Sequence, residues 1–116
     1  MQRIMLHGKI HRARVTARSI DYPGSVAVDA ELLEKAGIKE FEKVLVANVA
    51  NGSRAETYAI AGRRGSGEVV LNGATARLGE VGDIVIIMAF AVVDEAELTG
   101  SWQPKVVNVN EKNRPV

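Results

Sequence analysis

Short β-type runs separated by glycine-containing turns extend along almost the whole of this 116-residue chain. From His11 to Arg18 the sequence "HRARVTAR" alternates two kinds of side chain, and a period of two predicts a half-buried strand. Strand-like runs recur in "SVAVD", "EVVLNG", "KVVNVN" and on both sides of "ANGS" in "KVLVANVANGSRAETYAIA". "DIVIIMAFAVV" is apolar on both faces, so we expect it in the centre of the sheet. Many short strands with Gly-rich turns predict a mainly-β fold, closed as a barrel.

Three local signals divide these strands. Tyr22-Pro23-Gly24-Ser25 fits a type II turn, because Pro sets the first central φ and Gly tolerates the positive φ of the second. Asn51-Gly52 between two strand-like runs predicts a hairpin turn. Asp29 can cap a short helix, "AELLEKA", which Gly37 can end in the left-handed region. We expect this helix to be the longest in the chain.

Composition excludes several classes of function. Fifteen Lys and Arg against fourteen Asp and Glu give a formal net charge of +1, too little to attract nucleic acid or an anionic membrane. The chain has no Cys, so disulfides, thiolate nucleophiles and thiolate metal sites are excluded. Its longest apolar run has ten residues, whereas a membrane-spanning helix needs about 20. We expect one domain, located in the cytoplasm, since no signal-peptide pattern precedes it.

Motifs for metal, phosphate and nucleic acid are weak. His7 and His11 have the spacing of metal ligands on a helix, but in a strand four residues span about 13 Å, so no metal site is predicted. "GRRGSGE" matches neither common phosphate-binding pattern and is expected to be a flexible loop. The arginines of "HRARVTAR", with Arg63 and Arg64, are expected to be surface charges, because only five aromatic residues are available to stack bases.

Lys9, Arg54 and Tyr58 are stronger candidates for a site, since cations and a phenol can hold carboxylates and move a proton. Arg54 and Tyr58 would share one face of their strand, and Thr57 would point the other way. All three can line one site only if the strand bends or lies at a boundary.

Six segments, taken in order, resemble one family. They are "MLHGKIHRARVT", "YPGSVAVD", "NGSRAETYAI", "RGSG", "LNGATA" and "GDIVII". Together they are similar to the pyruvoyl-dependent aspartate 1-decarboxylases, which supply β-alanine to the pantothenate pathway, and the resemblance runs from Met1 to about Asn113. It implies a double-psi β-barrel with short helices, assembled as a homotetramer with its sites between neighbouring subunits.

The resemblance also implies self-cleavage between Gly24 and Ser25, into a β chain of residues 1–24 and an α chain of residues 25–116. Attack by the Ser25 hydroxyl on the Gly24 carbonyl would give an ester, and elimination and hydrolysis would convert Ser25 into a covalent pyruvoyl cofactor. Thr57 would position the Gly24 carbonyl or its oxyanion. The resemblance assigns lesser roles in processing to His11, Tyr22 and Asn72.

In the mature enzyme implied by the resemblance, the pyruvoyl group at position 25 forms a Schiff base with L-aspartate. Tyr58 would protonate the product of decarboxylation, and Lys9 and Arg54 would hold substrate carboxylates. The substrate-binding residues implied are Lys9, Arg54, Thr57, Gly73, Ala74 and Thr75, the last three through backbone amides.

The chain departs from the family pattern at three points. Pro23 replaces a larger acyclic residue, Thr75 stands where Ala is usual, and the tail after Asn113 is short. Two alternatives stay open: an unprocessed, non-catalytic β-barrel that binds or assembles, and a nucleic-acid-binding barrel that the near-neutral charge disfavours. The sequence also leaves open whether cleavage needs a helper protein.

Overall fold

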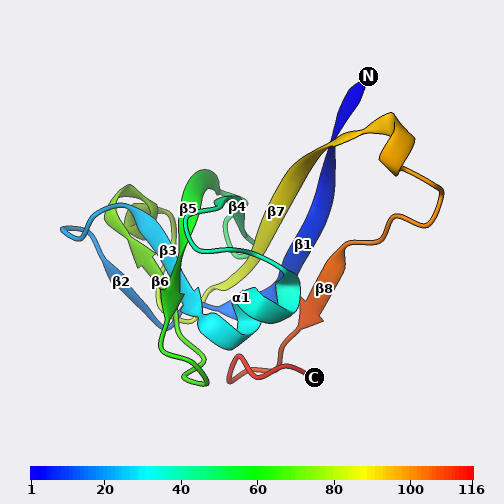
Figure 1. Cartoon of the computed structure of the whole chain (residues 1–116). Coiled ribbons are helices and arrows are strands. Elements are labelled where there is room, and N and C mark those ends of the chain that lie inside the picture. The colour runs from blue at the N-terminus through cyan, green and yellow to red at the C-terminus, as the bar shows by residue number, and fades with distance from the viewer.

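The computed structural model describes all 116 residues and consists mainly of strands (Figure 1). In chain order the elements are β1 (Gln2–Arg14), β2 (Ala17–Ser19), β3 (Ser25–Asp29), α1 (Ala30–Ala36), β4 (Lys43–Asn48), β5 (Arg54–Gly62), β6 (Val69–Asn72), the 3-10 helix η1 (Gly73–Leu78), β7 (Ile84–Asp94), the 3-10 helix η2 (Glu95–Glu97) and β8 (Lys105–Asn108). The strands follow the order β2-β6-β3-β5-β4-β7-β1-β8.

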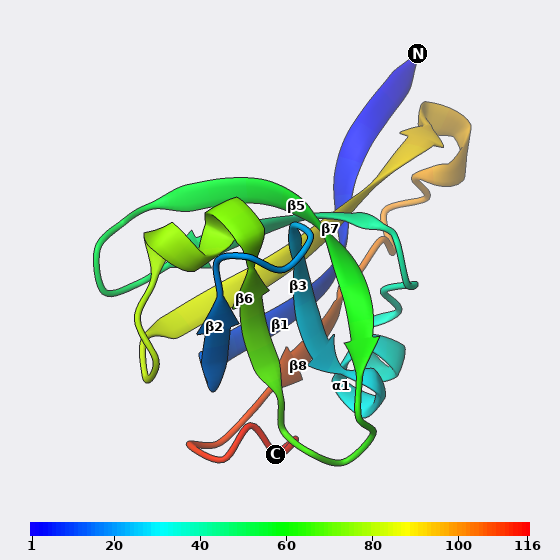
Figure 2. The ribbon, with the colours of Figure 1, turned by 90° about the vertical axis from the view of Figure 1, so that its left-hand side faces the viewer.

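Chain continuity closes this sheet into a barrel. Only Val15 and Thr16 separate β1 from β2, yet β1 pairs with β7 and β2 pairs with β6. One segment therefore joins the first strand of the order to the strand next to its other end (Figure 2). Parallel pairs, β2–β6, β3–β5 and β1–β8, stand among antiparallel ones and require crossed connections. The predicted mainly-β barrel with short helices is the architecture observed.

The core fills the barrel with aliphatic side chains from alternating strand positions. Ile10, Val28, Leu71 and Ile87 are among its fully or almost fully buried members. β7 lies between β1 and β4, as predicted for a central strand. Its outer face near the C-terminal end is nevertheless open, since Phe90 and Val92 are exposed.

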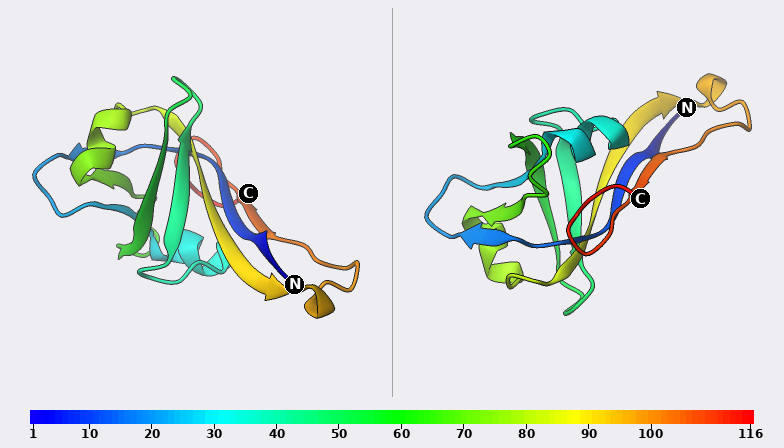
Figure 3. Two further views of the ribbon diagram at one scale, coloured as in Figure 1. Left: turned by 90° about the horizontal axis from the view of Figure 1, so that it is seen from above. Right: turned by 90° about the horizontal axis from the view of Figure 1, so that it is seen from below.

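That open face belongs to an arm that projects from the barrel. The N-terminal half of β1 pairs with the C-terminal half of β7, from Gln2–Asp94 to Leu6–Phe90, and both run beyond the rest of the sheet (Figure 3). The arm therefore presents apolar side chains that the chain itself does not cover.

Two sequence predictions about turns and strands are wrong. Gly24 has no positive φ, so Tyr22–Ser25 is not a type II turn; the hydrogen-bonded turn precedes it, where the Tyr22 N–H donates to the Ser19 carbonyl at 3.4 Å. The strand predicted from His11 to Arg18 is interrupted at Thr16, because the Thr16 hydroxyl and N–H bind Val69 of β6 instead of continuing along β7.

The hairpin prediction needs a smaller correction. β4 and β5 are antiparallel neighbours as expected, and Gly52 takes a φ of 75°. The connection, however, spans residues 49–53 rather than Asn51-Gly52 alone, because the Asn48 side chain and backbone hold it open by accepting from Ala50 and Gly52.

Asp29 joins the short helix to the glycine-rich loop. Its carboxylate accepts the backbone N–H groups of Glu31 and Gly65, each at 2.9 Å, and of Gly67 at 2.8 Å. Burial by itself raises the pKa of Asp29. The hydrogen bonds from these N–H groups, together with the charge of Arg114, lower the pKa by more than burial raises it, so it lies below the ordinary value of 3.8. The predicted cap and the left-handed Gly37 are both confirmed. No helix here has the length and apolar character needed to cross a membrane.

Replacing Asp29 should destabilise the fold. Asp29→Ala leaves buried N–H groups without an acceptor, and we expect the free energy of unfolding to fall by about 3 kcal/mol. Glu34→Ala, which removes an exposed carboxylate from the same helix, should cost no more than about 0.5 kcal/mol. Denaturant unfolding measures both values; equal stabilities would contradict the role of Asp29.

Because the folded pKa of Asp29 is lowered, the stabilisation that Asp29 provides should be present above pH 3.8 and disappear as the pH falls through the folded value.

Candidate functional site

Ser25 stands at the start of β3 with its side chain turned into the protein. The residue is only 1% exposed, and its Oγ accepts a hydrogen bond from Asn72 Nδ2 at 3.0 Å. Ser25 and Asn72 are also paired directly across β3 and β6. A buried hydroxyl is therefore held by a buried amide at the point where the chain enters the barrel.

Gly73 brings a second backbone segment against Gly24. Its φ is +63°, and a Cβ added there would lie 2.7 Å from Gly24 Cα and 2.9 Å from Gly24 N. Only glycine permits this approach. Gly24 is different: a Cβ on it would meet nothing within 4 Å, so in this conformation the packing demands glycine at position 73 and not at 24.

Thr75 completes this cluster through its side chain as well as its backbone. Its hydroxyl donates to the Asn72 carbonyl at 2.7 Å and lies 3.4 Å from the Ser25 carbonyl oxygen. Thr75 is buried, so the extra atoms relative to Ala are accommodated inside the protein. The cluster of Gly24, Ser25, Asn72, Gly73 and Thr75 is called the Ser25 centre below.

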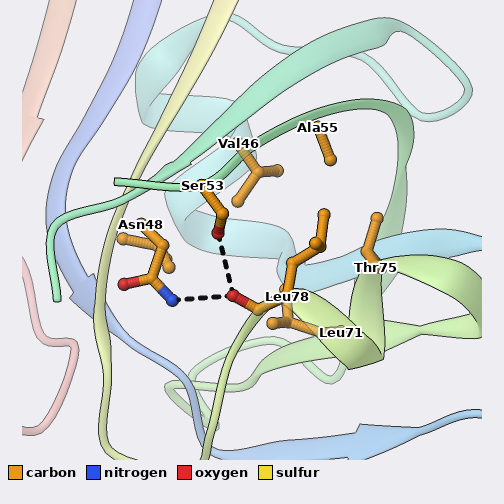
Figure 4. Close-up of a pocket in the computed structure, with 8 residues that line it drawn as sticks. Val46, Asn48, Ser53, Ala55, Leu71, Thr75 and Leu78 are labelled. Atoms are coloured by element: carbon orange, nitrogen blue, oxygen red, sulfur yellow. Dashed lines mark hydrogen bonds between the residues drawn. The ribbon is translucent and has the colours of Figure 1, made fainter. Parts of the chain in front are cut away.

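A small cavity beside Thr75 links this centre to the β4–β5 loop (Figure 4). At its edge the Leu78 carbonyl accepts from Asn48 Nδ2 and Asn51 Nδ2, both at 3.0 Å, and from Ser53 Oγ at 2.9 Å. The cavity measures about 10 Å³, room for no more than one water molecule. The three hydrogen bonds to Leu78 hold the loop before Arg54 against η1. The cavity itself is too small for a substrate. Sequence reasoning missed these three polar side chains, whose only signal is their position around the hairpin.

The other predicted residues lie apart from the Ser25 centre. Along β5, Arg54 and Tyr58 are exposed and Thr57 is half-buried, which confirms that Thr57 faces the opposite way. Lys9 is half-buried on β1. None of these four side chains hydrogen-bonds to Ser25 or Gly24 within the chain, and Lys9 and Arg54 form no ion pair. Ala74 is exposed at the start of η1.

Backbone register nevertheless brings Tyr58 towards Ser25. The parallel pairing of β3 with β5 begins at Val26 and Ala59, the residues directly after Ser25 and Tyr58. The two strands therefore bring positions 25 and 58 to the same end of the pairing. Both precede paired core residues, so both lie on the face of the sheet away from the core, where Ser25 is buried and Tyr58 is exposed.

His11, on β1, and Tyr22, in the segment before β3, are the other residues assigned to processing. The Nδ1 atom of His11 is buried without a hydrogen-bond partner, and burial, followed by the charges of Lys9 and Arg12, lowers the pKa of His11 below 6.5. The lowered pKa favours the neutral form of His11. Tyr22 is exposed, but its carbonyl packs close to Gly73.

The histidine pair considered above does not form one site. His7 Nε2 contacts Glu42 Oε2 at 2.5 Å, whereas His11 has no such partner. No group of three or more His, Cys, Asp or Glu side chains is arranged to hold a metal ion.

A family model and curated relatives both match nearly the whole chain to aspartate decarboxylases. The family model described as "Aspartate decarboxylase" matches residues 1–116. Curated proteins named "Aspartate 1-decarboxylase" from Burkholderia vietnamiensis and Burkholderia cenocepacia are each 54% identical over 114 residues, covering 98% of this chain and 89% of theirs. Among solved structures, the computationally designed protein msDPBB_sym2 is 23% identical, with a TM-score of 0.47, over 77% of this chain and 99% of its own.

The family match spans the residues of the Ser25 centre and the outer residues Lys9, Arg54 and Tyr58 alike. A chain matched over its whole length, and more than half identical to curated members over nearly all of it, belongs to the aspartate decarboxylase family.

Proposed function

We propose that this protein is a self-processing, pyruvoyl-dependent decarboxylase that converts L-aspartate to β-alanine and carbon dioxide for pantothenate biosynthesis. Membership of the aspartate decarboxylase family supports the substrate and the reaction. Processing would cut between Gly24 and Ser25, into residues 1–24 and 25–116. The proposal assigns the enzyme to the cytoplasm and leaves open whether a helper protein accelerates the cut.

One observation carries the processing step: the buried Ser25 hydroxyl, hydrogen-bonded to Asn72 beside a closely packed Gly24 backbone. Asn72 donates to Oγ, so the hydroxyl keeps its own proton and is oriented by a residue of the neighbouring strand. Gly73 leaves the space into which the Gly24 peptide fits. These surroundings suit a residue 25 that reacts with the preceding carbonyl and then remains shielded from solvent.

The proposed self-cleavage between Gly24 and Ser25 proceeds by acyl shift, elimination and hydrolysis. Ser25 Oγ bonds to the Gly24 carbonyl carbon, the Gly24–Ser25 C–N bond breaks, and the freed nitrogen takes the hydroxyl proton, which leaves an ester. A base then removes the Ser25 Cα proton as the Cβ–Oγ bond breaks, so that Gly24 leaves as a carboxylate and position 25 becomes dehydroalanine. Water adds to its imine tautomer and ammonia departs, leaving a ketone. The assisting residues in this proposal are His11, whose lowered pKa favours the neutral form, Tyr22 and Thr57.

The ketone supplies an electrophile for the substrate amine and accepts the electron pair released with carbon dioxide. Arg54 can bind one substrate carboxylate through its planar guanidinium, and Lys9 can bind the other as a point charge. Neither has an ion-pair partner within the chain, so both are free for a dicarboxylate. Tyr58 donates the proton to the product carbon, and Thr57 with the backbone of Gly73, Ala74 and Thr75 completes the pocket.

The outward position of Arg54 and Tyr58 is the reason to place each site between two copies of the chain. The outer side of β1, β4, β5 and β7 carries an open hollow of about 360 Å³, lined mostly by apolar side chains such as Ile4 and Val92. Ile4 is 74% exposed and Val92 63% exposed. A second copy covering this face would bury them and could approach the Tyr58 side of β5. The proposed assembly is a homotetramer.

Processing and catalysis should be separable by substitution. Ser25→Ala has no hydroxyl to attack Gly24, so we expect one uncut chain and no turnover. Tyr58→Phe keeps Ser25 and should still be cut, but lose about 100-fold or more in kcat because the proton donor is missing. Intact mass spectrometry and a β-alanine assay measure the two properties. An uncut wild-type chain that still makes β-alanine would refute the pyruvoyl mechanism, and one that stays uncut and inactive even with cell extract would favour the non-catalytic barrel.

Assembly should depend on the exposed apolar face. We expect the wild type to sediment as a tetramer and Val92→Asp, which places a charge in that face, to sediment as smaller species with reduced turnover. Val116→Asp, at the exposed last residue of the chain, serves as the control and should assemble normally. A fully active wild-type monomer would contradict the shared sites.

His11 should make the stability depend on pH. Its folded pKa is lowered, so the unfolded chain binds a proton more readily, and the stability that is present above pH 6.5 should decrease as the pH falls below that value. In a Ser25→Ala chain, which stays uncut, the unfolding temperature should therefore drop between pH 7.5 and 5.5, and adding His11→Gln should reduce that drop. An unchanged drop would show that His11 is not its cause.

A further inference from the structure

An aromatic residue occupies a strained backbone position next to Tyr58. Phe41, in the turn between α1 and β4, has a φ of +72°. Left-handed φ values are strained for bulky side chains, and at the equivalent position of tight turns Gly or Asn is usual. Phe41 is also 71% exposed, so burial of its ring in the core does not explain its presence.

The surroundings hold this turn from several directions. The Phe41 N–H donates to the Ala59 carbonyl at 2.7 Å, and the Ala59 N–H donates to the Glu42 carbonyl at 3.0 Å. Glu40 accepts from the Ala61 N–H at 2.9 Å. The turn is thereby fixed to β5 at Ala59, the residue that follows Tyr58, and at Ala61.

Glu42 anchors the same turn to β1. One carboxylate oxygen accepts the Lys39 N–H at 2.9 Å, and the other contacts His7 Nε2 at 2.5 Å. Strained residues persist where neighbouring structure over-determines them, and they concentrate at functional sites. Here hydrogen bonds join the turn both to β1, the strand that carries Lys9, and to β5, the strand that carries Tyr58.

The Phe41 ring contacts the Tyr58 ring. Their centroids are 6.5 Å apart and their planes are tilted by 34°, within the range of attractive aromatic pairs. Tyr58 is 37% exposed, and its phenol makes no hydrogen bond within the chain. Phe41 is its one aromatic contact.

From these contacts we propose that Phe41 is a positioning residue, which holds the Tyr58 ring in the orientation needed for proton donation at the substrate site. The inference rests on the proposed function of Tyr58. The anchored turn keeps the Phe41 ring in place despite the strain, and that ring limits the motion of the phenol. A mobile phenol would spend less time in line with the carbon that receives the proton.

The test uses Phe41→Asn with Phe41→Tyr as its matched control. Asn tolerates a positive φ, so Phe41→Asn should fold with an unfolding temperature equal to or above that of the wild type. It should be cut after Gly24 at the normal rate, keep its KM and sedimentation, and lose about tenfold in kcat. Phe41→Tyr retains the ring and should keep kcat within about twofold of the wild type.

Tyr58→Phe and Phe41→Asn together distinguish a failure of the positioning role of Phe41 from a failure of the proposed function of Tyr58. If Tyr58→Phe, measured in parallel, keeps its turnover, the proposed role of Tyr58 fails, and the positioning role fails with it. If Tyr58→Phe is inactive but Phe41→Asn keeps its kcat, only the positioning role is overturned. Loss of assembly or of stability in Phe41→Asn would also overturn it, because Phe41 would then act through the fold or the interface.

Discussion

The exchange of hydrogen-bonding partners at Thr16 is the contact on which the rest of the structure depends. The Thr16 hydroxyl accepts the Val69 N–H at 3.0 Å and donates to the Val69 carbonyl at 3.1 Å, where the N-terminal segment passes from β7 to β6. This switch closes the barrel. It also fixes β6 beside β2 and β3, so that Asn72, at the end of β6, reaches the hydroxyl of Ser25.

Burial divides the functional residues into two groups. Ser25, Asn72 and Thr75 are buried and form hydrogen bonds with one another, which suits a reaction of the chain with itself. Arg54 and Tyr58 turn outwards from β5, where a second molecule can approach. Alternation does not cause this division, because Ser25 and Tyr58 precede the paired core residues Val26 and Ala59 and so share the outer face of the sheet. Contacts with η1 cover Ser25, whereas Tyr58 is left exposed.

A positive backbone φ contributes both to the Ser25 centre and to the surroundings of Tyr58. At position 73 a positive φ and the absence of a Cβ allow η1 to contact Gly24. At position 41 a positive φ is imposed on a bulky residue, and hydrogen bonds to β5 hold it there. In the first case the sequence supplies glycine where the backbone needs it, and in the second the surroundings overcome the preference of the residue.

Local patterns in the sequence determined the strand character of most of the chain, the helix cap at Asp29, the left-handed Gly37 and the opposite facing of Thr57 and Tyr58, because each depends on neighbours a few residues away. Family resemblance indicated the candidate site residues. Only the tertiary structure decided that Gly24 takes no type II turn, that the first strand breaks at Thr16, and that Phe41 lies against Tyr58. These features depend on contacts with Gly73, Val69 and Ala59, which lie 18 to 53 positions away along the chain, and local propensity carries no information about such contacts.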